Sequence, residues 1–471
     1  MIDQAIPALP LASPPVSRWW GCYPELLRDS LGFLVRCQAY GDVVKLPMGL
    51  VFELLLRQRD AAIYLLNHPA DVKHVLVTNH DNYHKTAFTP AESRLFGQGV
   101  LHTDGEMHHR QRRLLLPFFH GHHVPAYTDL ITGKTLELVT RWHDGMTVDI
   151  GQEMAQLTLS IIWRVLFGQD VGTESDTIRE AIAVSQRLMK RQSDSLLAGV
   201  TPLWVPTPLH RAFNRGLSAI EAMIRRMIEE RRRASEPHED VLALLLAARD
   251  AEGRPLSDKE IRDELVTLLL AGHETTANAL TWTWCLLSQF RSVRERLTRE
   301  LNEVIGDRLP TASDVPRLRY MKMVWGESLR LYPPAWSLHA RIGQAADQLP
   351  SGAVLPPRAS IFISPWSLHR NACWFPDPNR FDPERFSDDA RRTRTPYSYI
   401  PFGAGGRRCL GEDFAELEGL LILATIASKV QLRLVDGQTI QPKPAMTLCP
   451  PVSLQMTIQR AGITAPHPAV A

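Results

Sequence analysis

Hydrophobic and polar residues along this chain follow helical spacing over most of its length. Apolar positions recur every three or four residues, which predicts amphipathic helices over 128–142, 151–167, 213–234 and 258–289. The last of these helices has a clear start signal, because Ser257 at the N-cap and Glu260 three residues later form a capping box. From about residue 105 to residue 335 the pattern is helical almost throughout.

Strand-like runs are confined to the two ends of the chain. Residues 41–46 and 61–66 predict a strand pair, and Asn67-His68-Pro69 predicts a turn into a helix. After Pro333-Pro334 the chain becomes strand-like and then passes through a Pro- and Asp-rich meander at 371–400. A helix over 410–427 leads into a hairpin, 431–435 with 452–459. The predicted fold class is therefore mainly α with a small β part.

Length and composition indicate one large compact domain. A length of 471 residues alone would suggest two or three domains, but no Gly/Ser linker, low-complexity block or internal repeat divides the chain. We expect a Pro-rich N-terminal segment (1–20), a domain over 21–460 and a C-terminal tail (461–471). A net charge of +2 without a basic stripe gives no electrostatic case for nucleic-acid binding.

The sequence also predicts a soluble protein of the cytoplasm. Its N-terminus has no basic region followed by an apolar stretch, so we expect no signal peptide. Nowhere do eighteen apolar residues follow one another without a charge or break, so we expect no membrane span. The six cysteines form no Cys-x-x-Cys pair, which is typical of free thiols in a reducing compartment. We expect a monomer.

The most informative segment reads Phe402-Gly-Ala-Gly-Gly-Arg-Arg-Cys409-Leu-Gly411. A cysteine at a helix N-terminus meets unpaired backbone N–H groups and the positive end of the helix dipole, which favour the thiolate. Such a thiolate is a good axial ligand for haem iron. Gly403 and Gly405 would let the loop pass close under a flat porphyrin, Gly411 would remove bulk beside the sulfur, and Arg407 would bind a propionate.

The sequence of this segment allows two other interpretations. One is a Gly/Arg loop with a buried structural cysteine, which is disfavoured because Phe, two Gly, Arg and Cys rarely coincide at fixed spacing. The other is a phosphate-binding loop, but the Gly-x-x-x-x-Gly-Lys-Ser/Thr pattern is missing.

This segment fits Phe-x-x-Gly-x-Arg-x-Cys-x-Gly and resembles the cytochrome P450 superfamily. The order of predicted elements is similar to the P450 fold from about residue 20 to residue 460. The resemblance implies a heme b cofactor (iron protoporphyrin IX) with Cys409 as the axial ligand of its iron. Phe402, Arg407 and Gly411 would then be cofactor-binding residues.

The long helix carries Ala271-Gly272-His273-Glu274-Thr275-Thr276. Gly272 inside a helix costs about 1 kcal/mol against Ala, so a bulky group such as haem pressed against the helix is one explanation. Thr275 would open the helical ladder, hold a water and donate a proton, and Glu274 would relay protons from solvent. A polar stripe on a surface helix is the alternative, but the flanking residues are apolar. The resemblance implies that Glu274 and Thr275 are catalytic, and that His273 has no catalytic role.

Two further motifs gain meaning only from the resemblance. Glu327 and Arg330 form Glu-x-x-Arg on a helix, and with Arg385 they would form a buried network behind the cysteine loop. His108 and Arg112 stand nine and five residues before Pro117, where relatives commonly have Trp and Arg that bind the propionates. An imidazole N–H can replace an indole N–H in that role. Arg341 matches the position of the family's other arginine that binds a propionate.

The histidines invite a competing interpretation as a zinc site. No Cys or acidic partner completes a tight ligand set and the nearby arginines repel a cation, which makes zinc improbable. The six residues concerned are His102, His108, His109, His120, His122 and His123.

Substrate contacts can be placed by region only. The resemblance points to 86–101, 190–215, the long helix near Leu268 and Ala271, the 334–338 turn and the tip at 446–448. Six apolar residues there are candidates for a pocket, although a plain core role is equally compatible with the sequence: Phe88, Leu95, Phe96, Trp336, Leu338 and Met446.

The resemblance implies a monooxygenase that hydroxylates or epoxidises a lipophilic small molecule such as a fatty acid, terpenoid or polyketide. No flavin or iron–sulfur segment follows the last hairpin, so we expect electrons from a separate ferredoxin with its NAD(P)H reductase. A peroxide-driven or rearranging haem-thiolate enzyme and a non-catalytic haem-binding protein are the alternatives, and the intact acid–alcohol pair argues against both. A basic docking face or an ordinary solvated helix face would account for His109, Arg110, Arg113 and Arg408.

Overall fold

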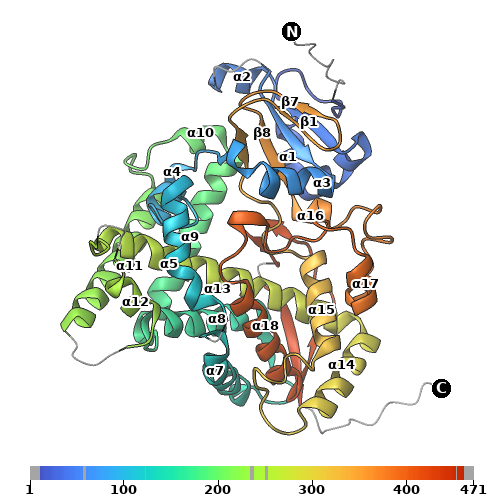
Figure 1. The fold of residues 1–471 in the computed structure, drawn as a ribbon. Coiled ribbons are helices and arrows are strands. Elements are labelled where there is room, and N and C mark those ends of the chain that lie inside the picture. Colours follow the sequence, from blue (N-terminus) through green and yellow to red (C-terminus); the bar gives the residue numbers. More distant parts are fainter. Residues whose placement is uncertain are drawn as a thin grey trace. The chain divides into compact units, whose positions relative to one another are not determined.

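The computed structural model describes residues 11–56, 60–121, 123–233, 238–249, 253–451 and 453–460 (Figure 1). The start of the N-terminal segment (1–10), the whole tail (461–471) and His122 lie outside these residues. The predicted fold class is confirmed, since helices dominate and the sheets are small. Contacts group the chain into two compact units: unit 1 is Met1–Ala87 with Leu329–Cys409, and unit 2 is Phe88–Ser328 with Leu410–Ala471.

Unit 1 is built around a five-stranded sheet in the order β1-β2-β8-β5-β3. The predicted strand pair is confirmed as β1 (Val43–Pro47) and β2 (Ala62–Leu66), antiparallel with Val43 opposite Leu66. β2 pairs in parallel with β8 (Ser360–Ile363), which comes from the far end of the sequence. β5 (Arg341–Gly343) then pairs with both β8 and β3 (Tyr83–Lys85) in antiparallel fashion. The sheet therefore joins the two stretches that make up the unit.

Short helices and a hairpin complete unit 1. They are α1 (Tyr23–Arg36), η1 (Cys37–Tyr40), α2 (Leu50–Leu56), α3 (Pro69–Lys73), the π-helix η2 (His74–Thr78), η3 (His80–Asn82), β6 (Asp347–Gln348), β7 (Val354–Leu355), α16 (Pro365–Leu368), η5 (Pro383–Phe386), α17 (Asp388–Thr393) and η6 (Gly405–Arg407). The apolar face of the sheet and helix α3 share one core, which includes Tyr64, Val72, Ile361 and Leu368.

The loop that carries Cys409 lies against η2 in this unit. Gly405 has a φ of +67°, a conformation that residues with a Cβ adopt at a cost. A Cβ on Gly405 would lie 2.0 Å from the carbonyl oxygen of Leu76, so the backbone of the loop packs directly on the backbone of η2. Gly403 also has a positive φ, +69°. The predicted need for glycine is confirmed, although at Gly405 the close neighbour is protein backbone.

Unit 2 is helical with small sheets at the chain's C-terminal end. Its helices are α4 (Pro90–Phe96), α5 (Gly105–Phe119), α6 (His123–Ala126), α7 (Thr128–Arg141), α8 (Ile150–Phe167), η4 (Gly172–Glu174), α9 (Ser175–Asp194), α10 (Leu196–Val200), α11 (Pro208–Arg233), α12 (Val241–Ala247), α13 (Asp258–Gln289), α14 (Arg291–Val304), α15 (Arg319–Leu331, whose last turn belongs to unit 1) and α18 (Glu412–Ala427). The four predicted amphipathic helices are confirmed as α7, α8, α11 and α13. No described helix has the length and apolar character to cross a membrane.

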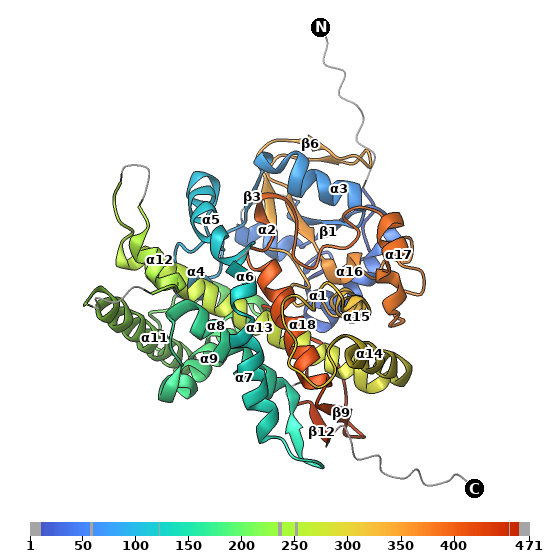
Figure 2. The same cartoon turned by 60° about the horizontal axis from the view of Figure 1, so that its bottom comes forward.

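The long helix α13 is the centre of unit 2. Its predicted capping box is present, with the Ser257 hydroxyl accepting from the backbone N–H of Glu260. α8 packs along α13 (Figure 2). A Cβ on Gly272 would lie 3.0 Å from the side chain of Ile162 on α8, so close helix packing explains this glycine. The expected explanation, haem pressed against Gly272, is therefore replaced by contact with α8.

The predicted C-terminal hairpin is confirmed as β9 (Val430–Leu434) and β12 (Gln455–Arg460), antiparallel with Val430 opposite Arg460. A third strand that the pattern did not reveal, β4 (Thr147–Asp149), pairs with the other edge of β12. The short hairpin β10 (Lys443–Pro444) with β11 (Leu448–Cys449) forms the tip at 446–448. Helix α18 begins at Glu412, two residues later than predicted.

Gly405→Ala tests the close packing of the cysteine loop. The variant combines a strained φ, worth about 1–3 kcal/mol, with overlap on the Leu76 carbonyl, so we expect the free energy of unfolding to fall by more than about 2 kcal/mol. Gly406→Ala is the matched control, because Gly406 is exposed and an added Cβ meets no atom within 4 Å. Denaturant unfolding followed by circular dichroism gives both values. Equal stability of the two variants would contradict the packing described here.

Candidate functional site

Cys409 lies at the end of a loop that its own backbone braces. The N–H of Cys409 donates to the carbonyl of Phe402 (2.9 Å), and the N–H of Gly403 donates to the carbonyl of Ile400 (3.0 Å). Cys409 is exposed, which excludes the alternative of a buried structural cysteine. It precedes the first residue of α18 by three positions, so it lies just before the helix and outside its first turn. The sequence predicts a helix that begins directly after Cys409, at residue 410.

Three cationic side chains of unit 1 lie near one another, and one of them, Arg407, belongs to this loop. Lys85 on β3 is directly opposite Arg341 on β5. Burial, and then the positive charges of Arg407 and Arg341, lower the pKa of the Lys85 ammonium to about 6. Burial lowers the pKa of Arg341 and of Arg407 to about 10. Like charges held together away from water are costly, so the cluster fits a bound group with negative charge.

Lys85 was not found by sequence reasoning. A single lysine in a short strand carries no signal of its own, and only the register of β3 on β5 places it opposite Arg341. Arg341 and Arg407, both predicted propionate ligands, are thus brought together within unit 1.

Helix α5 supplies the two predicted residues of unit 2. His108 is buried and Arg112 is half-buried, and they lie one turn apart on the same side of the helix. The next histidine, His109, is exposed, with its ring centroid 5.7 Å from that of His108. Phe88 stacks on His102 (centroids 3.6 Å apart), so this histidine belongs to an aromatic cluster.

The zinc alternative finds no support in the described part of the chain. No three His, Cys, Asp or Glu side chains there are grouped so that they could hold a metal ion. His120 pairs with Asp413 at 2.5 Å, and His123 stacks near Phe118.

The middle of α13 is accessible over one turn. Ala271 is exposed and Thr275 is half-buried, whereas Leu268–Leu270 and Ala277 are buried. The Thr275 hydroxyl donates to the carbonyl of Ala271 (2.7 Å), and the helix continues without a break. The expected opening of the ladder at Thr275 is therefore wrong for this structure. A small residue and a hydroxyl at this spacing leave room for a group beside the helix.

Glu274 is held by the tip of the β10–β11 hairpin. Its Oε1 accepts from the hydroxyl of Thr447 (2.5 Å), which in turn accepts from the amide of Asn278 (2.9 Å). Burial raises the pKa of Glu274, and the polar side chains of Thr447, Gln186 and Cys449 counteract part of that rise. Glu274 thus favours its protonated form and is linked to a segment predicted to contact substrate.

His273 lies in the interior of unit 2. It is buried, and burial lowers the pKa of its ring to about 4. Its backbone carbonyl accepts from Thr158 on α8 (3.1 Å). The prediction that His273 has no catalytic role agrees with this neutral, interior position.

Glu418 on α18 is a second buried acid, and sequence reasoning missed it. Its exposure is 0 %, and burial raises its pKa to about 8, an effect that the nearby Thr276 side chain only partly offsets. A glutamate inside the apolar run of α18 was the available signal, since charged residues are almost never fully buried without a reason. Thr276 belongs to the predicted acid–alcohol motif, so α18 and α13 share a polar contact.

The predicted Glu-x-x-Arg residues are completely buried on α15. Arg330 donates from Nη1 to the carbonyls of His369 and Pro378 (both 2.8 Å) and from Nη2 to that of Arg380 (3.2 Å). Arg385 donates to the carbonyl of Asp377 (3.1 Å). Both arginines therefore bind backbone carbonyls of the Pro- and Asp-rich meander. Its path was not predictable from sequence.

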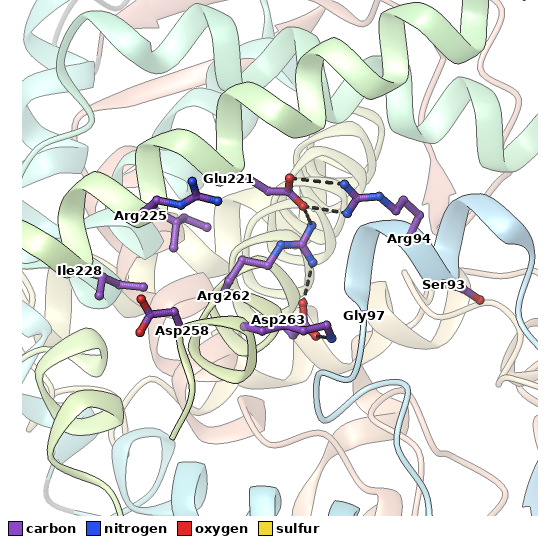
Figure 3. A pocket seen from close by; sticks show the side chains of 11 residues that line it. Ser93, Arg94, Gly97, Glu221, Arg225, Ile228, Asp258, Arg262 and Asp263 are labelled. Carbon is purple, nitrogen blue, oxygen red and sulfur yellow. Dashed lines mark hydrogen bonds and ion pairs between the residues drawn. The ribbon is translucent and has the colours of Figure 1, made fainter. Parts of the chain in front are cut away.

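A surface pocket of about 400 Å³ in unit 2 is distinct from these residues (Figure 3). Glu221 accepts from Arg94 (2.7 Å) and from Arg262 (2.9 Å), and Arg262 also pairs with Asp263 (2.7 Å). These ion pairs join α11, α4 and α13. None of the predicted catalytic or cofactor-binding residues lines the pocket, so it is not the candidate active site.

The apolar pocket candidates divide by burial. Leu95 and Phe96 are buried core residues. Phe88 and Met446 are half-buried, as are Leu338 and Trp336, which pack on the edges of two unit 1 clusters.

The family model described as "Cytochrome P450" matches residues 45–458. The chain is 36% identical to "Cyclooctatin synthase" of Streptomyces melanosporofaciens over 427 residues, which cover 90% of each chain. It is 36% identical to "Cyclooctat-9-en-7-ol 5-monooxygenase" of the same organism over 88% of each chain, and 29% identical to "Pentalenene oxygenase" of Streptomyces avermitilis over 95% of this chain and 96% of that one.

Solved structures show the same fold. The "cytochrome P450DA heme domain" superposes with a TM-score of 0.84 at 24% identity, covering 96% of this chain and 98% of that chain. "Retinoic acid bound cyanobacterial CYP120A1" gives a TM-score of 0.81 at 24% identity, covering 96% and 100%.

Glu418 makes stability depend on pH. The folded protein keeps the proton on this carboxyl up to about pH 8, whereas the unfolded chain loses it near pH 4.5. The folded state binds more protons in that window, so Glu418 lowers the free energy of unfolding as pH rises, by up to about 1.4 kcal/mol per pH unit. Glu418→Gln should remove this contribution, as seen in Tm measured across the window. Glu416→Gln, on the exposed side of α18, is the control. Identical pH slopes for both variants would show that Glu418 ionises normally.

Proposed function

Because this chain belongs to the cytochrome P450 family and is a haem-dependent monooxygenase, we propose that its substrate is a cyclic terpenoid. One oxygen atom of dioxygen would enter a C–H bond or a double bond. The relatives named for cyclooctat-9-en-7-ol and pentalenene, both terpenoids, support this substrate class. The structural observation that supports a haem-dependent reaction is the cluster of Lys85, Arg341 and Arg407, whose last member stands two residues before the exposed Cys409.

We propose heme b as the cofactor, since its two propionates suit this cluster. Arg341, Arg407 and Lys85 would bind the carboxylates, and a bound dianion would raise the pKa of the Lys85 ammonium. His108 and Arg112 would add donors from α5. Phe402 and Gly411 would border the macrocycle, and an added Cβ on Gly411 would meet no protein atom within 4 Å.

Cys409 would supply its thiolate sulfur to the haem iron. Haem, when bound, supplies the activation of dioxygen with two electrons. The protein's own contribution is to hold and move protons. Burial raises the pKa of Glu274, which suits it to carry a proton, and the adjacent Thr275 presents a hydroxyl at the accessible turn of α13. For Thr275 to donate outward, its hydroxyl proton must leave the carbonyl of Ala271.

We propose a ferredoxin as electron donor, reduced by its NAD(P)H reductase, and a monomer in the cytoplasm. All six cysteines are free thiols, which agrees with a reducing compartment. On α5, His109 and Arg113 are exposed and lie one turn apart, while Arg408 is exposed in the cysteine loop. Arg110, the fourth residue of the expected docking face, instead pairs with Glu260 (2.8 Å).

Substrate class is tested with a panel of cyclic terpenoid alcohols and hydrocarbons, fatty acids and macrolides. Terpenoids should shift the iron spin state on binding and yield a product that contains one atom of ¹⁸O from labelled dioxygen. The product should depend on NAD(P)H and a ferredoxin system. Turnover of fatty acids with no shift by any terpenoid would contradict the proposed substrate while leaving the monooxygenase in place.

Electron delivery is tested by charge reversal. Arg113→Glu should slow reduction by an acidic ferredoxin several-fold at low salt, and the difference should shrink as the Debye length falls to about 8 Å at physiological ionic strength. Arg225→Glu on α11 is the control, since it makes the same change in net charge at another exposed position. Substrate affinity should stay constant. Equal rates in both variants would remove α5 from the docking face.

A further inference from the structure

We propose that His369 is a positioning residue for the loop that carries Cys409, acting through one tautomer of its ring. The inference rests on the proposed function, in which the Cys409 sulfur binds haem iron. It concerns unit 1 alone, because residues 330, 369 and 400–409 all belong to that unit.

The side chains of His369 and Arg330 each contact the backbone carbonyl of the other residue. Arg330 Nη1 donates to the carbonyl of His369 (2.8 Å), and Nδ1 of His369 lies 3.3 Å from the carbonyl of Arg330. Both residues have 0 % exposure. The His369 imidazole therefore contacts the backbone carbonyl of Arg330, and the Arg330 side chain in turn binds the backbone carbonyl of His369.

The second ring nitrogen reaches the start of the cysteine loop. The backbone N–H of Ile400 donates to Nε2 of His369 (2.9 Å). Since an N–H can only donate, Nε2 must carry the lone pair. The proton of a neutral imidazole then sits on Nδ1, where the carbonyl of Arg330 accepts it. The two contacts require the same tautomer, and a protonated ring would satisfy only one of them.

From Ile400 the constraint continues to Cys409 through backbone hydrogen bonds. The carbonyl of Ile400 accepts from Gly403, and the carbonyl of Phe402 accepts from Cys409. The intervening Gly405 packs on the carbonyl of Leu76. The loop is thus fixed at its beginning by His369, in its middle by η2 and at its end by its own turn.

The surroundings keep the ring neutral. Burial, followed by the positive charges of Arg330, Arg370 and Arg394, holds the pKa of His369 well below its usual range. No acidic group contributes to this pKa shift. The ring of Tyr399 lies beside that of His369, with the ring centroids 5.1 Å apart. Ile400 follows Tyr399 directly, so the same imidazole contacts two consecutive residues of the loop.

Loss of the His369 ring would leave the backbone N–H of Ile400 and the backbone carbonyl of Arg330 without this hydrogen-bond partner in the protein interior. An unsatisfied buried group is costly enough to favour local rearrangement. The loop would then hold Cys409 less firmly, and the iron–sulfur bond would be broken more readily.

The chain contains a matched control. His273 is also buried and neutral, but it lies on α13 in unit 2 and has no hydrogen bond to the cysteine loop. His369→Leu and His273→Leu therefore each remove a buried, neutral imidazole, and only the first removes the support of Ile400. His369→Gln offers a rescue, since one amide can donate to a carbonyl and accept from an N–H.

The readout is the absorption of the reduced carbon monoxide complex, in which thiolate ligation gives a red-shifted Soret band. At a temperature below unfolding, His369→Leu should lose this band roughly tenfold faster than wild type. His273→Leu should lose it at the wild-type rate even where its Tm falls equally, and His369→Gln should be intermediate. Loss at the same rate in both Leu variants would overturn the inference while leaving the proposed function intact.

Two further measurements keep the test decisive. If His369→Leu does not fold, ¹⁵N NMR of the diamagnetic carbon monoxide complex of wild type reports the tautomer directly. One imidazole with a proton on Nδ1 that persists to acidic pH supports the inference, and a proton on Nε2 overturns it. A wild-type protein without the red-shifted band would overturn the proposed function, and this inference with it.

Discussion

The structure of the cysteine loop depends on one buried cation. Arg330 has no exposed surface, yet it binds the backbone carbonyls of His369 and of two meander residues, Pro378 and Arg380. A buried guanidinium must have its donors satisfied, and residues 371–382 of the meander form no helix or strand that would otherwise fix their path. Removal of this charge would release both the meander and His369, on which the loop begins. The fold of unit 1 and the position of Cys409 therefore share one electrostatic requirement.

A second group of buried and half-buried cations, also in unit 1, is relevant to the cofactor. Burial, and then the positive charges of Arg407 and Arg341, lower the pKa of Lys85 to about 6. In a monooxygenase of the P450 family, the dianionic edge of haem is the group that such a cluster suits. In unit 2, burial raises the pKa of two acids, Glu274 and Glu418. Unit 1 thus contains a cluster of buried and half-buried cations, and unit 2 contains two acids with raised pKa values.

Local signals in the sequence were sufficient for the elements and for the motifs. Periodicity located α7, α8, α11 and α13, and the capping box at Ser257 marked the start of α13. Spacing alone identified Cys409 and Arg407. Contacts between distant segments were not accessible in this way. The place of β8 beside β2, the register of Lys85 on Arg341 and the bond from Ile400 to His369 join residues far apart in the chain. Gly272 shows the same limit, because its neighbour Ile162 lies on another helix.

The central claim is that Cys409 is the axial ligand of the haem iron. Its most direct test is the carbon monoxide difference spectrum of the reduced protein in three forms: wild type, Cys409→Ser and Cys373→Ser. Cys373 is the matched control, as an exposed free cysteine of the same unit. We predict the red-shifted Soret band of thiolate ligation in wild type and in Cys373→Ser, and its absence in Cys409→Ser. Retention of that band in Cys409→Ser would contradict the account.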